Sequence, residues 1–363
     1  MPDLVVLIKP ASGGCNMRCK YCFYADELNK RKEGVRSFMS YETARNLIAR
    51  AFDYADGTCT FAFQGGEPTL RGLEFFHFFV KTAAESPARK CAVHYAIQTN
   101  GLLIDEAWAA FLKENNFLVG LSLDGSSEIH NANRVDANGR GTYNRCVQAA
   151  AILKKYQIPF NILTVVTARS AKNIVSVYNS FMKNGYLYQQ YIPCLDPIFE
   201  ERGQSEFSLT PEAFGNYLIR LFDRWLLDRK NGKFVYVQYF ENLAGMLKGY
   251  APSSCGMTGV CSRQNVIEAD GSVYPCDFYA LDEYLVGNIN HDSFFDLDKN
   301  RVGFLDDSLK GLEKCQSCPY LQICRGGCRR DRQEANGIGD NYLCEGYKMF
   351  FAHALPKLYE LIR

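Results

Sequence analysis

Short apolar segments alternate with longer amphipathic segments along the first part of the chain. The apolar segments are rich in β-branched and aromatic residues, and several are nearly continuous apolar runs, which is typical of parallel strands buried on both faces. We expect strands at residues 4–8, 59–63, 92–98, 117–123, 160–167 and 187–192. The segments between them repeat apolar residues at helical spacing. We expect helices at residues 41–54, 73–84, 105–115, 143–156 and 171–183.

This order of strand–helix units predicts an α/β fold with a parallel sheet and outer helices, either open or closed into a partial barrel. Thr210 and Pro211 begin a further predicted helix that runs to about Lys230, with the threonine as N-cap and the proline in the first turn. In parallel α/β proteins, functional sites gather at the C-terminal ends of strands. The segments that follow the predicted strands are therefore the expected location of a site.

The pattern changes near residues 250–254, and from Cys255 onward the apolar periodicity weakens while glycine and cysteine dominate. Such a segment buries too little apolar surface to fold alone, so we expect its fold to depend on bound metal. Residues 347–362 have the pattern of a closing helix. We expect one domain at residues 1–234 and a second, cysteine-rich domain at residues 235–363.

Charge and hydropathy limit the possible partners and compartments. Lys plus Arg is 41 and Asp plus Glu is 40, so the net charge of +1 gives no general case for binding nucleic acid or an anionic membrane. The N-terminal apolar run has no basic region before it, and no later run reaches the ~18 apolar residues of a spanning helix. We therefore expect no membrane partner and a cytoplasmic location. In a reducing compartment, the 15 cysteines favour metal binding, and the five scattered histidines favour all-thiolate sites.

Three cysteines, Cys15, Cys19 and Cys22, follow the first predicted strand with the spacing C-x3-C-x2-C. Three thiolates on one short loop can hold three irons of a [4Fe–4S] cluster, which normally takes four cysteines, and leave the fourth iron open to chelate a small molecule. A zinc site is the alternative, but structural zinc usually takes four ligands and no histidine lies nearby.

With an aromatic residue before its last cysteine, this motif resembles the signature of the radical S-adenosylmethionine (SAM) superfamily. The resemblance implies that the open iron binds SAM and that the reduced cluster cleaves it to methionine and a 5′-deoxyadenosyl radical, which abstracts a hydrogen atom. Residues 64–68, Gln-Gly-Gly-Glu-Pro, resemble the family's GGEP motif. The residues that the resemblance places against SAM are Gly66 near the amino group, Ser122 and Arg134 at the carboxylate end, and Tyr21 and Leu195 at the adenine.

A second set of eight cysteines lies between residues 255 and 344, and its later part has the spacing C-x2-C-x5-C-x3-C. Eight cysteines can fully ligate two [4Fe–4S] clusters. This set resembles the SPASM domain, a cysteine-rich extension of some radical SAM enzymes. Two structural zinc sites are the alternative that the C-x2-C spacing permits. The resemblance, rather than the spacing, implies a partial (β/α)6 barrel followed by this domain, and the following two ligand sets. Auxiliary cluster I would take Cys255, Cys261, Cys276 and Cys328, and auxiliary cluster II would take Cys315, Cys318, Cys324 and Cys344.

The wider resemblance covers nearly the whole chain and is closest to the anaerobic sulfatase-maturating enzymes, especially those of clostridia. It rests on residues 7–12, 61–70, 194–197 and 270–279. It implies that the protein uses SAM and three [4Fe–4S] clusters to oxidise an active-site cysteine or serine of a sulfatase to Cα-formylglycine, after hydrogen abstraction at Cβ. It also implies that Asp277 accepts the substrate proton. Asp277 adjoins Cys276, a predicted ligand of auxiliary cluster I. The substrate proton and the substrate electron would therefore pass to neighbouring acceptors.

Two other functions compete with sulfatase maturation. Many SPASM-bearing enzymes form thioether or carbon–carbon crosslinks in ribosomal peptides, often with a leader-binding domain before the first cysteines. Here the cysteines begin at residue 15, so we expect direct recognition of a short motif. An iron–sulfur electron carrier or a zinc-stabilised binding module is the non-enzymatic alternative, but neither needs an open iron or a GGEP loop. A flavodoxin or ferredoxin is the expected reductant by family analogy, and the preference between cysteine and serine is left open.

Overall fold

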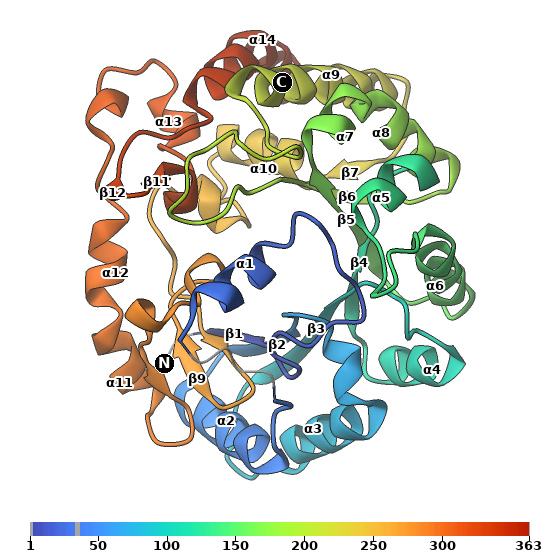
Figure 1. Ribbon diagram of the computed structural model, residues 1–363, viewed down its shortest axis with the longest axis vertical. Coiled ribbons are helices and arrows are strands. Elements are labelled where there is room, and N and C mark those ends of the chain that lie inside the picture. The colour runs from blue at the N-terminus through green and yellow to red at the C-terminus, as the bar shows by residue number, and fades with distance from the viewer. Residues whose placement is uncertain (1–2, 33–36, 363) are drawn as a thin grey trace. The chain divides into compact units, whose positions relative to one another are not determined.

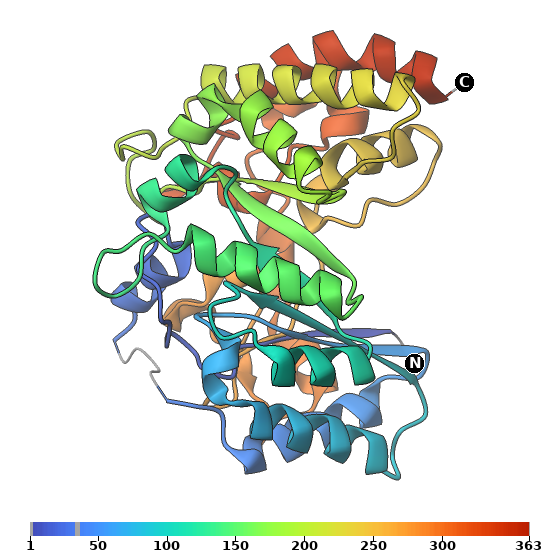
Figure 2. The ribbon, with the colours of Figure 1, turned by 90° about the vertical axis from the view of Figure 1, so that its right-hand side faces the viewer.

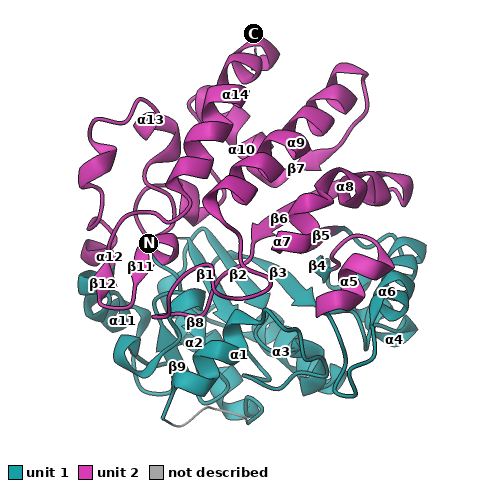
Figure 3. Cartoon of the chain, turned by 45° about the horizontal axis from the view of Figure 1, so that its top comes forward, with its two compact units in different colours: residues 1–122, 134–160, 263–304 teal, residues 123–133, 161–262, 305–363 magenta. Residues whose placement is uncertain are grey.

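The computed structural model describes residues 3–32 and 37–362. They form two compact units that interleave along the chain (Figure 3). Unit 1 comprises residues 1–122, 134–160 and 263–304, and unit 2 comprises residues 123–133, 161–262 and 305–363. The domain boundary that we expect between residues 234 and 235 stays a prediction, because packing units need not coincide with family domains.

Unit 1 is built on a sheet whose first four strands are parallel and follow the order of the chain (Figure 1). They are β1 (Leu4–Ile8), β2 (Thr58–Phe63), β3 (Ala92–Thr99) and β4 (Leu118–Ser122). The helices between and after them are α1 (Phe23–Lys30), α2 (Tyr41–Tyr54), α3 (Leu73–Glu85), α4 (Glu106–Glu114) and α6 (Tyr143–Lys155). The first four predicted strands and the first four predicted helices are confirmed to within two residues, and α1 is an additional helix.

Aromatic side chains fill the core between this sheet and α3. Phe63 on β2 lies 4.8 Å from Phe76 and 5.1 Å from Phe79, measured between ring centroids. All three side chains are buried, and the two helical residues lie three positions apart on one face of α3. This packing fixes the ends of the strands from which the loops described below begin, because large buried rings leave little room for a strand to shift.

Part of the cysteine-rich region returns to unit 1, which the sequence pattern did not predict. The short strand β8 (Val266–Ile267) pairs in parallel with β1, with Val266 opposite Leu7. The strands β9 (Ser272–Tyr274) and β10 (Gly287–Asn288) continue the sheet in antiparallel pairs, followed by α11 (Phe294–Asn300). Residues 263–304 therefore place Glu268 and Asp277 in the same packing unit as the N-terminal cysteines.

Unit 2 contains the later strand–helix units and most of the cysteine-rich region. Its strands are β5 (Phe160–Val166), β6 (Tyr188–Pro193), β7 (Tyr236–Val237), β11 (Gln333–Glu334) and β12 (Gly337–Ile338). Its helices are α5 (Ser127–Asn133), α7 (Ala168–Lys172), α8 (Ile174–Lys183), α9 (Pro211–Lys230), α10 (Gln238–Leu247), α13 (Leu321–Cys324) and α14 (Cys344–Ile362), and α12 (Val302–Asp307) joins the two units in sequence. The strands β5, β6 and β7 are parallel neighbours.

Two helix predictions in unit 2 need correction. The expected helix at residues 171–183 is two helices, because Thr167 and Ser170 form a capping box that begins α7 early and Asn173 interrupts the chain before α8. The closing helix begins at Cys344, three residues before the expected start. The prediction for α9 is confirmed, since the Thr210 side chain accepts a hydrogen bond from the Ala213 amide at 3.1 Å.

The helices α9 and α14 pack closely against each other through two glycines (Figure 2). A Cβ atom on Gly346 would lie 2.3 Å from the Pro211 carbonyl oxygen, and one on Gly215 would lie 2.9 Å from the Gly346 Cα. The first turn of α14 carries Cys344, so this contact fixes the position of one predicted cluster ligand. Among the described residues there is no helix with the length and apolar character that a bilayer span requires.

Candidate functional site

The first three cysteines lie on the loop that joins β1 to α1, and Cys22 precedes the first residue of that helix. Cys15 and Cys19 are partly exposed and Cys22 is exposed. The Met17 amide donates to the Cys15 sulfur at 3.3 Å, and the Cys22 amide donates to the Cys19 carbonyl at 3.2 Å. Burial raises the pKa of the Cys15 thiol to about 11, so a bound cation is needed to keep this thiolate ionised. A loop of three thiolates with amide donors fits the ligand chemistry of an iron–sulfur cluster.

The cysteine loop is held against residues 134–136 of the same unit. The Arg18 amide donates to the Val135 carbonyl at 2.7 Å, and Met17 forms a β-bridge with Asp136. The Arg134 guanidinium carbon lies 5.5 Å from the centre of the Tyr21 ring, and both side chains are buried. The structure therefore brings together two of the residues that the sequence predicts to contact SAM.

The second of the two glycines in the GGEP loop is required by a contact with the cysteine loop. The Gly66 amide donates to the Ser12 carbonyl, and the Glu67 amide donates to the Gly14 carbonyl, both at 2.8 Å. A Cβ atom on Gly66 would lie 2.2 Å from the Gly14 carbonyl oxygen. The absence of a side chain at Gly66 therefore allows the backbones of the two loops to approach each other, and the contact of Gly66 with SAM stays a prediction.

Glu67 is fully buried and joins the ends of β2 and β3. Its carboxylate accepts hydrogen bonds from the Thr69 amide at 3.0 Å, the Thr99 hydroxyl at 2.8 Å and the Asn100 amide at 2.8 Å. Burial raises the pKa of Glu67, and these hydrogen bonds oppose that rise. The Asn100 side chain in turn donates to the Asn16 side chain at 2.7 Å. Glu67 therefore positions the cysteine loop through Asn100, a role that the GGEP motif alone did not reveal.

The remaining predicted SAM contacts occur in different units. Ser122 is buried at the end of β4 in unit 1. Leu195 is partly buried and follows β6 in unit 2. Both residues lie at the C-terminal ends of parallel strands, as the rule for parallel α/β proteins predicts.

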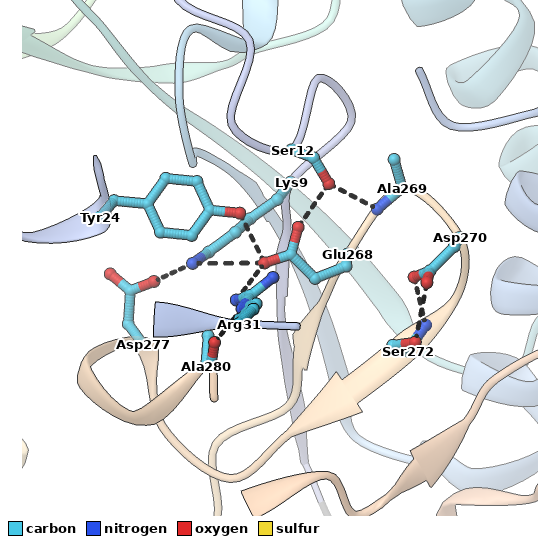
Figure 4. Close-up of polar contacts among 10 residues, drawn as sticks. All are labelled: Lys9, Ser12, Tyr24, Arg31, Glu268, Ala269, Asp270, Ser272, Asp277 and Ala280. Atoms are coloured by element: carbon cyan, nitrogen blue, oxygen red, sulfur yellow. Dashed lines mark hydrogen bonds and ion pairs between the residues drawn. The ribbon is translucent and has the colours of Figure 1, made fainter. Parts of the chain in front are cut away.

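Asp277 begins a short 3-10 helix (Asp277–Tyr279) and pairs with a buried lysine (Figure 4). Lys9 Nζ lies 2.9 Å from Asp277 Oδ1, and the two side chains are 0% and 20% exposed. Lys9 Nζ also lies 3.6 Å from the centre of the Tyr24 ring. Burial lowers the pKa of Lys9, but Asp277 and Glu268 outweigh it and hold the pKa above its ordinary value. A partly exposed carboxylate beside a buried cation is thus available to a substrate.

Glu268 is the buried centre of the same cluster (Figure 4). Its Oε1 accepts hydrogen bonds from the Tyr24 hydroxyl at 2.5 Å and from Arg31 Nη2 at 3.0 Å, and its Oε2 accepts one from the Ser12 hydroxyl at 2.5 Å. Burial alone would raise the pKa of Glu268, but Lys9 and Arg31 lower it below its ordinary value. Sequence reasoning missed this residue. It also missed Lys9, whose position at the end of an apolar strand was the available signal, because a buried charge needs a partner.

Four cysteines of unit 2 line one cavity of about 240 Å³. They are the set predicted for auxiliary cluster II, namely Cys315, Cys318, Cys324 and Cys344. Burial raises the pKa of the Cys324 thiol to about 11, and the other three thiols of the set contribute to this rise. Four thiols around one cavity fit the donor set of a [4Fe–4S] cluster, whose iron would stabilise the ionised thiolates.

Three of the cysteines predicted for auxiliary cluster I lie in unit 2, and Cys276 lies in unit 1. A Cβ atom on Gly256, next to Cys255, would lie 3.5 Å from the Cys328 Cβ, and the Cys261 amide donates to the Ser308 hydroxyl at 3.0 Å. Burial raises the pKa of the Cys261 thiol, and two buried arginines near it oppose that rise. These arginines are Arg329 and Arg332. Buried positive charge suits a site that would hold an anionic thiolate cluster.

Two family models match this chain. The radical SAM superfamily model matches residues 10–179, and the SPASM iron–sulfur cluster-binding domain model matches residues 255–319. These matches confirm both domains that the cysteine motifs predicted. The protein is a radical SAM enzyme with an additional iron–sulfur-binding domain on a mostly parallel α/β fold.

Relatives and solved structures show to which family within the radical SAM superfamily the chain belongs. The chain is 46% identical over 362 residues to a cysteine-type anaerobic sulfatase-maturating enzyme of Clostridium novyi, covering 99% of this chain and 97% of that protein. It is 30% identical to a serine-type anaerobic sulfatase-maturating enzyme of Bacteroides thetaiotaomicron, covering 97% and 90%. A solved structure of native anSMEcpe with bound AdoMet and Cp18Cys peptide is 43% identical, with a TM-score of 0.95 and 99% coverage of both chains. The chain belongs to the anaerobic sulfatase-maturating enzymes.

Proposed function

We propose that this protein oxidises an active-site cysteine of a sulfatase to Cα-formylglycine, with SAM and three [4Fe–4S] clusters as cofactors. The observation that carries the proposal is the 46% identity to a cysteine-type relative over 99% of the chain. Identity to the serine-type relative is 30%, which favours cysteine as the preferred target. The similarity to a solved structure with both AdoMet and a peptide supports the same substrate class. It favours sulfatase maturation over crosslink formation in ribosomal peptides.

When bound, SAM and its cluster would supply the 5′-deoxyadenosyl radical that removes a hydrogen atom from the target Cβ. Cys15, Cys19 and Cys22 would hold this cluster. Gly66, Ser122, Arg134, Tyr21 and Leu195 are the residues proposed to bind SAM. The guanidinium of Arg134 suits a carboxylate, and its contact with the Tyr21 ring supports the assignment.

The auxiliary clusters would be held by the two sets of four cysteines given above. The cavity lined by Cys315, Cys318, Cys324 and Cys344 supports the second set. The electrostatic interaction of Cys328 with Cys255 and Cys261 supports a shared site for three members of the first. A flavodoxin- or ferredoxin-type protein is the proposed reductant.

Asp277 is the proposed acceptor of the substrate thiol proton. A general base must reach the proton that it removes, and the 20% exposed side chain of Asp277 is open to a ligand while Lys9 compensates its charge from the buried side. Tyr24 and Gln64 are candidates to bind the peptide backbone. Tyr24 is buried, its hydroxyl already donates to Glu268 and Lys9 covers its ring, so Gln64 is the stronger candidate.

The test is anaerobic reconstitution with iron and sulfide, reduction in the presence of SAM, and incubation with a peptide that carries a Cys-x-Pro-x-Arg motif. The expected result is a mass loss of about 18 Da, the change from a CH2SH to a CHO side chain, with equimolar 5′-deoxyadenosine. In competition, a matched serine peptide is expected to react more slowly. SAM cleavage with an unchanged cysteine peptide would contradict the proposed substrate, and faster conversion of the serine peptide would contradict the cysteine preference.

A further inference from the structure

We propose that Glu268 is a positioning residue for Asp277, acting through Lys9 and Arg31. The inference rests on the proposed function, since it concerns the group that accepts the substrate proton. Glu268 is 0% exposed and has polar partners from three parts of unit 1: the loop after β1, the helix α1 and the segment around Arg31 (Figure 4).

Lys9 is confined on three sides. Its Nζ lies 2.9 Å from Asp277 Oδ1 and 3.8 Å from Glu268 Oε1, and the Tyr24 ring centre is 3.6 Å away. The same Glu268 oxygen accepts the Tyr24 hydroxyl, so it holds both the cation and the ring that covers it. A lysine side chain has several rotatable bonds and three donors, and its direction is therefore set by such surroundings.

Arg31 holds the other end of the segment that carries Asp277. Its Nη2 donates to Glu268 Oε1 at 3.0 Å, and its Nε donates to the Ala280 carbonyl. Residues 277–280 are thus fixed at Asp277 by Lys9 and at Ala280 by Arg31. Both fixing cations contact one carboxylate, that of Glu268.

A further contact joins this cluster to the GGEP loop. The Ser12 hydroxyl donates to Glu268 Oε2 at 2.5 Å, and the Ser12 carbonyl accepts the Gly66 amide at 2.8 Å. Removing the charge of Glu268 would leave Lys9 with the carboxylates of Asp277 and Glu27, and it would remove the carboxylate that pairs with Arg31. Lys9 would then lose one of the contacts that direct its ammonium group toward Asp277, so the Asp277 carboxylate would be held less firmly.

The test compares Glu268→Gln with Asp270→Asn in the fully reconstituted enzyme. Asp270 is an exposed carboxylate two residues away that accepts the Ser272 amide at 2.9 Å, and an asparagine oxygen can keep that bond. We expect E268Q to lower the ratio of formylglycine peptide to 5′-deoxyadenosine and to lower kcat at least about tenfold, with the peptide KM within about threefold of wild type. D270N is expected to keep the wild-type ratio.

A double variant separates positioning from a general structural effect. In the Asp277→Asn background, E268Q is expected to change the product ratio no further, whereas a purely structural loss would add to the D277N effect. Glu268→Asp, which keeps the charge, is expected to give an intermediate ratio, and it decides the question if E268Q does not fold. A wild-type ratio in E268Q would overturn the inference, and so would additive effects in the double variant. If only E268D folds, a wild-type ratio in E268D would overturn it. Failure of the wild-type enzyme to convert the peptide would instead refute the proposed function.

Discussion

At the scale of single residues, close contacts explain why particular amino acids stand in the GGEP loop. Gly66 has no room for a side chain, because a Cβ atom at this residue would lie 2.2 Å from the Gly14 carbonyl oxygen. Rigid backbone, rather than the end of a flexible side chain, is the obstacle. The loop that carries the cysteines and the loop predicted to hold SAM therefore fit together only with glycine at this position.

We predict that Gly66→Ala separates the two loops. The expected cost is about 1–3 kcal/mol in the free energy of unfolding, with SAM binding weakened about tenfold or more. Urea unfolding and equilibrium binding of SAM to the reconstituted protein measure the two effects. The control is Gly303→Ala on α12, where a Cβ meets nothing within 4 Å and alanine is expected to be neutral or stabilising by about 0.5–1 kcal/mol. Unchanged SAM affinity in G66A would contradict this account.

At the scale of helices and strands, α9 is tied to its neighbours by a buried acid near its C-terminal end. Asp228 accepts the Tyr178 hydroxyl of α8 at 3.1 Å and lies 2.9 Å from Arg224 and 3.2 Å from Lys233. Burial would raise the pKa of Asp228, but these partners lower it below the ordinary value of 3.8. The ionised form therefore stabilises the contact between α8 and α9.

We predict that Asp228→Asn destabilises the protein by about 1–3 kcal/mol near neutral pH. Because the folded pKa lies below the unfolded one, the contribution of the charge is fully present above the unfolded pKa and is lost as the pH falls through the folded pKa. The difference between wild type and D228N should stay constant down to about pH 5 and shrink below about pH 4. Urea unfolding of both proteins across this range measures it. A difference of the same size at about pH 3 as at about pH 7 would contradict the assignment.

Sequence patterns predict some of the helices and strands of this fold and miss others. The helix at residues 41–54 was predicted with both ends correct, because its apolar spacing is a local signal; the structure adds that the Ser40 side chain caps its first turn. The strand β8 was missed because two residues carry no periodic signal, and their pairing with β1 depends on contacts across the chain. The start of α7 was missed because the hydrogen bonds between Thr167 and Ser170 do not follow from apolar spacing.

At the scale of the whole molecule, the candidate site combines residues from distant parts of the chain. The cysteine loop was predicted from its spacing. The radical SAM model matches residues 10–179, which include this loop, and the SPASM model matches residues 255–319, which include five of the eight cysteines of the second set. The cluster around Glu268 was not predictable from one sequence, because Ser12 and Glu268 are 256 positions apart and no local pattern relates them. The position of Lys9 after an apolar strand indicates that a buried charge needs a partner. It does not identify Glu268 and Asp277 as the partners, because they lie far along the chain.

The measurement that tests the central claim most directly is the transfer of deuterium from substrate to cofactor. The reconstituted, reduced enzyme would be given SAM and a Cys-x-Pro-x-Arg peptide with both Cβ hydrogens of the target cysteine replaced by deuterium. Mass spectrometry of both products is expected to show one deuterium in 5′-deoxyadenosine and one retained on the formylglycine aldehyde, because the abstracted atom comes from that Cβ. Formation of 5′-deoxyadenosine without deuterium, alongside oxidised peptide, would contradict hydrogen abstraction at the target residue.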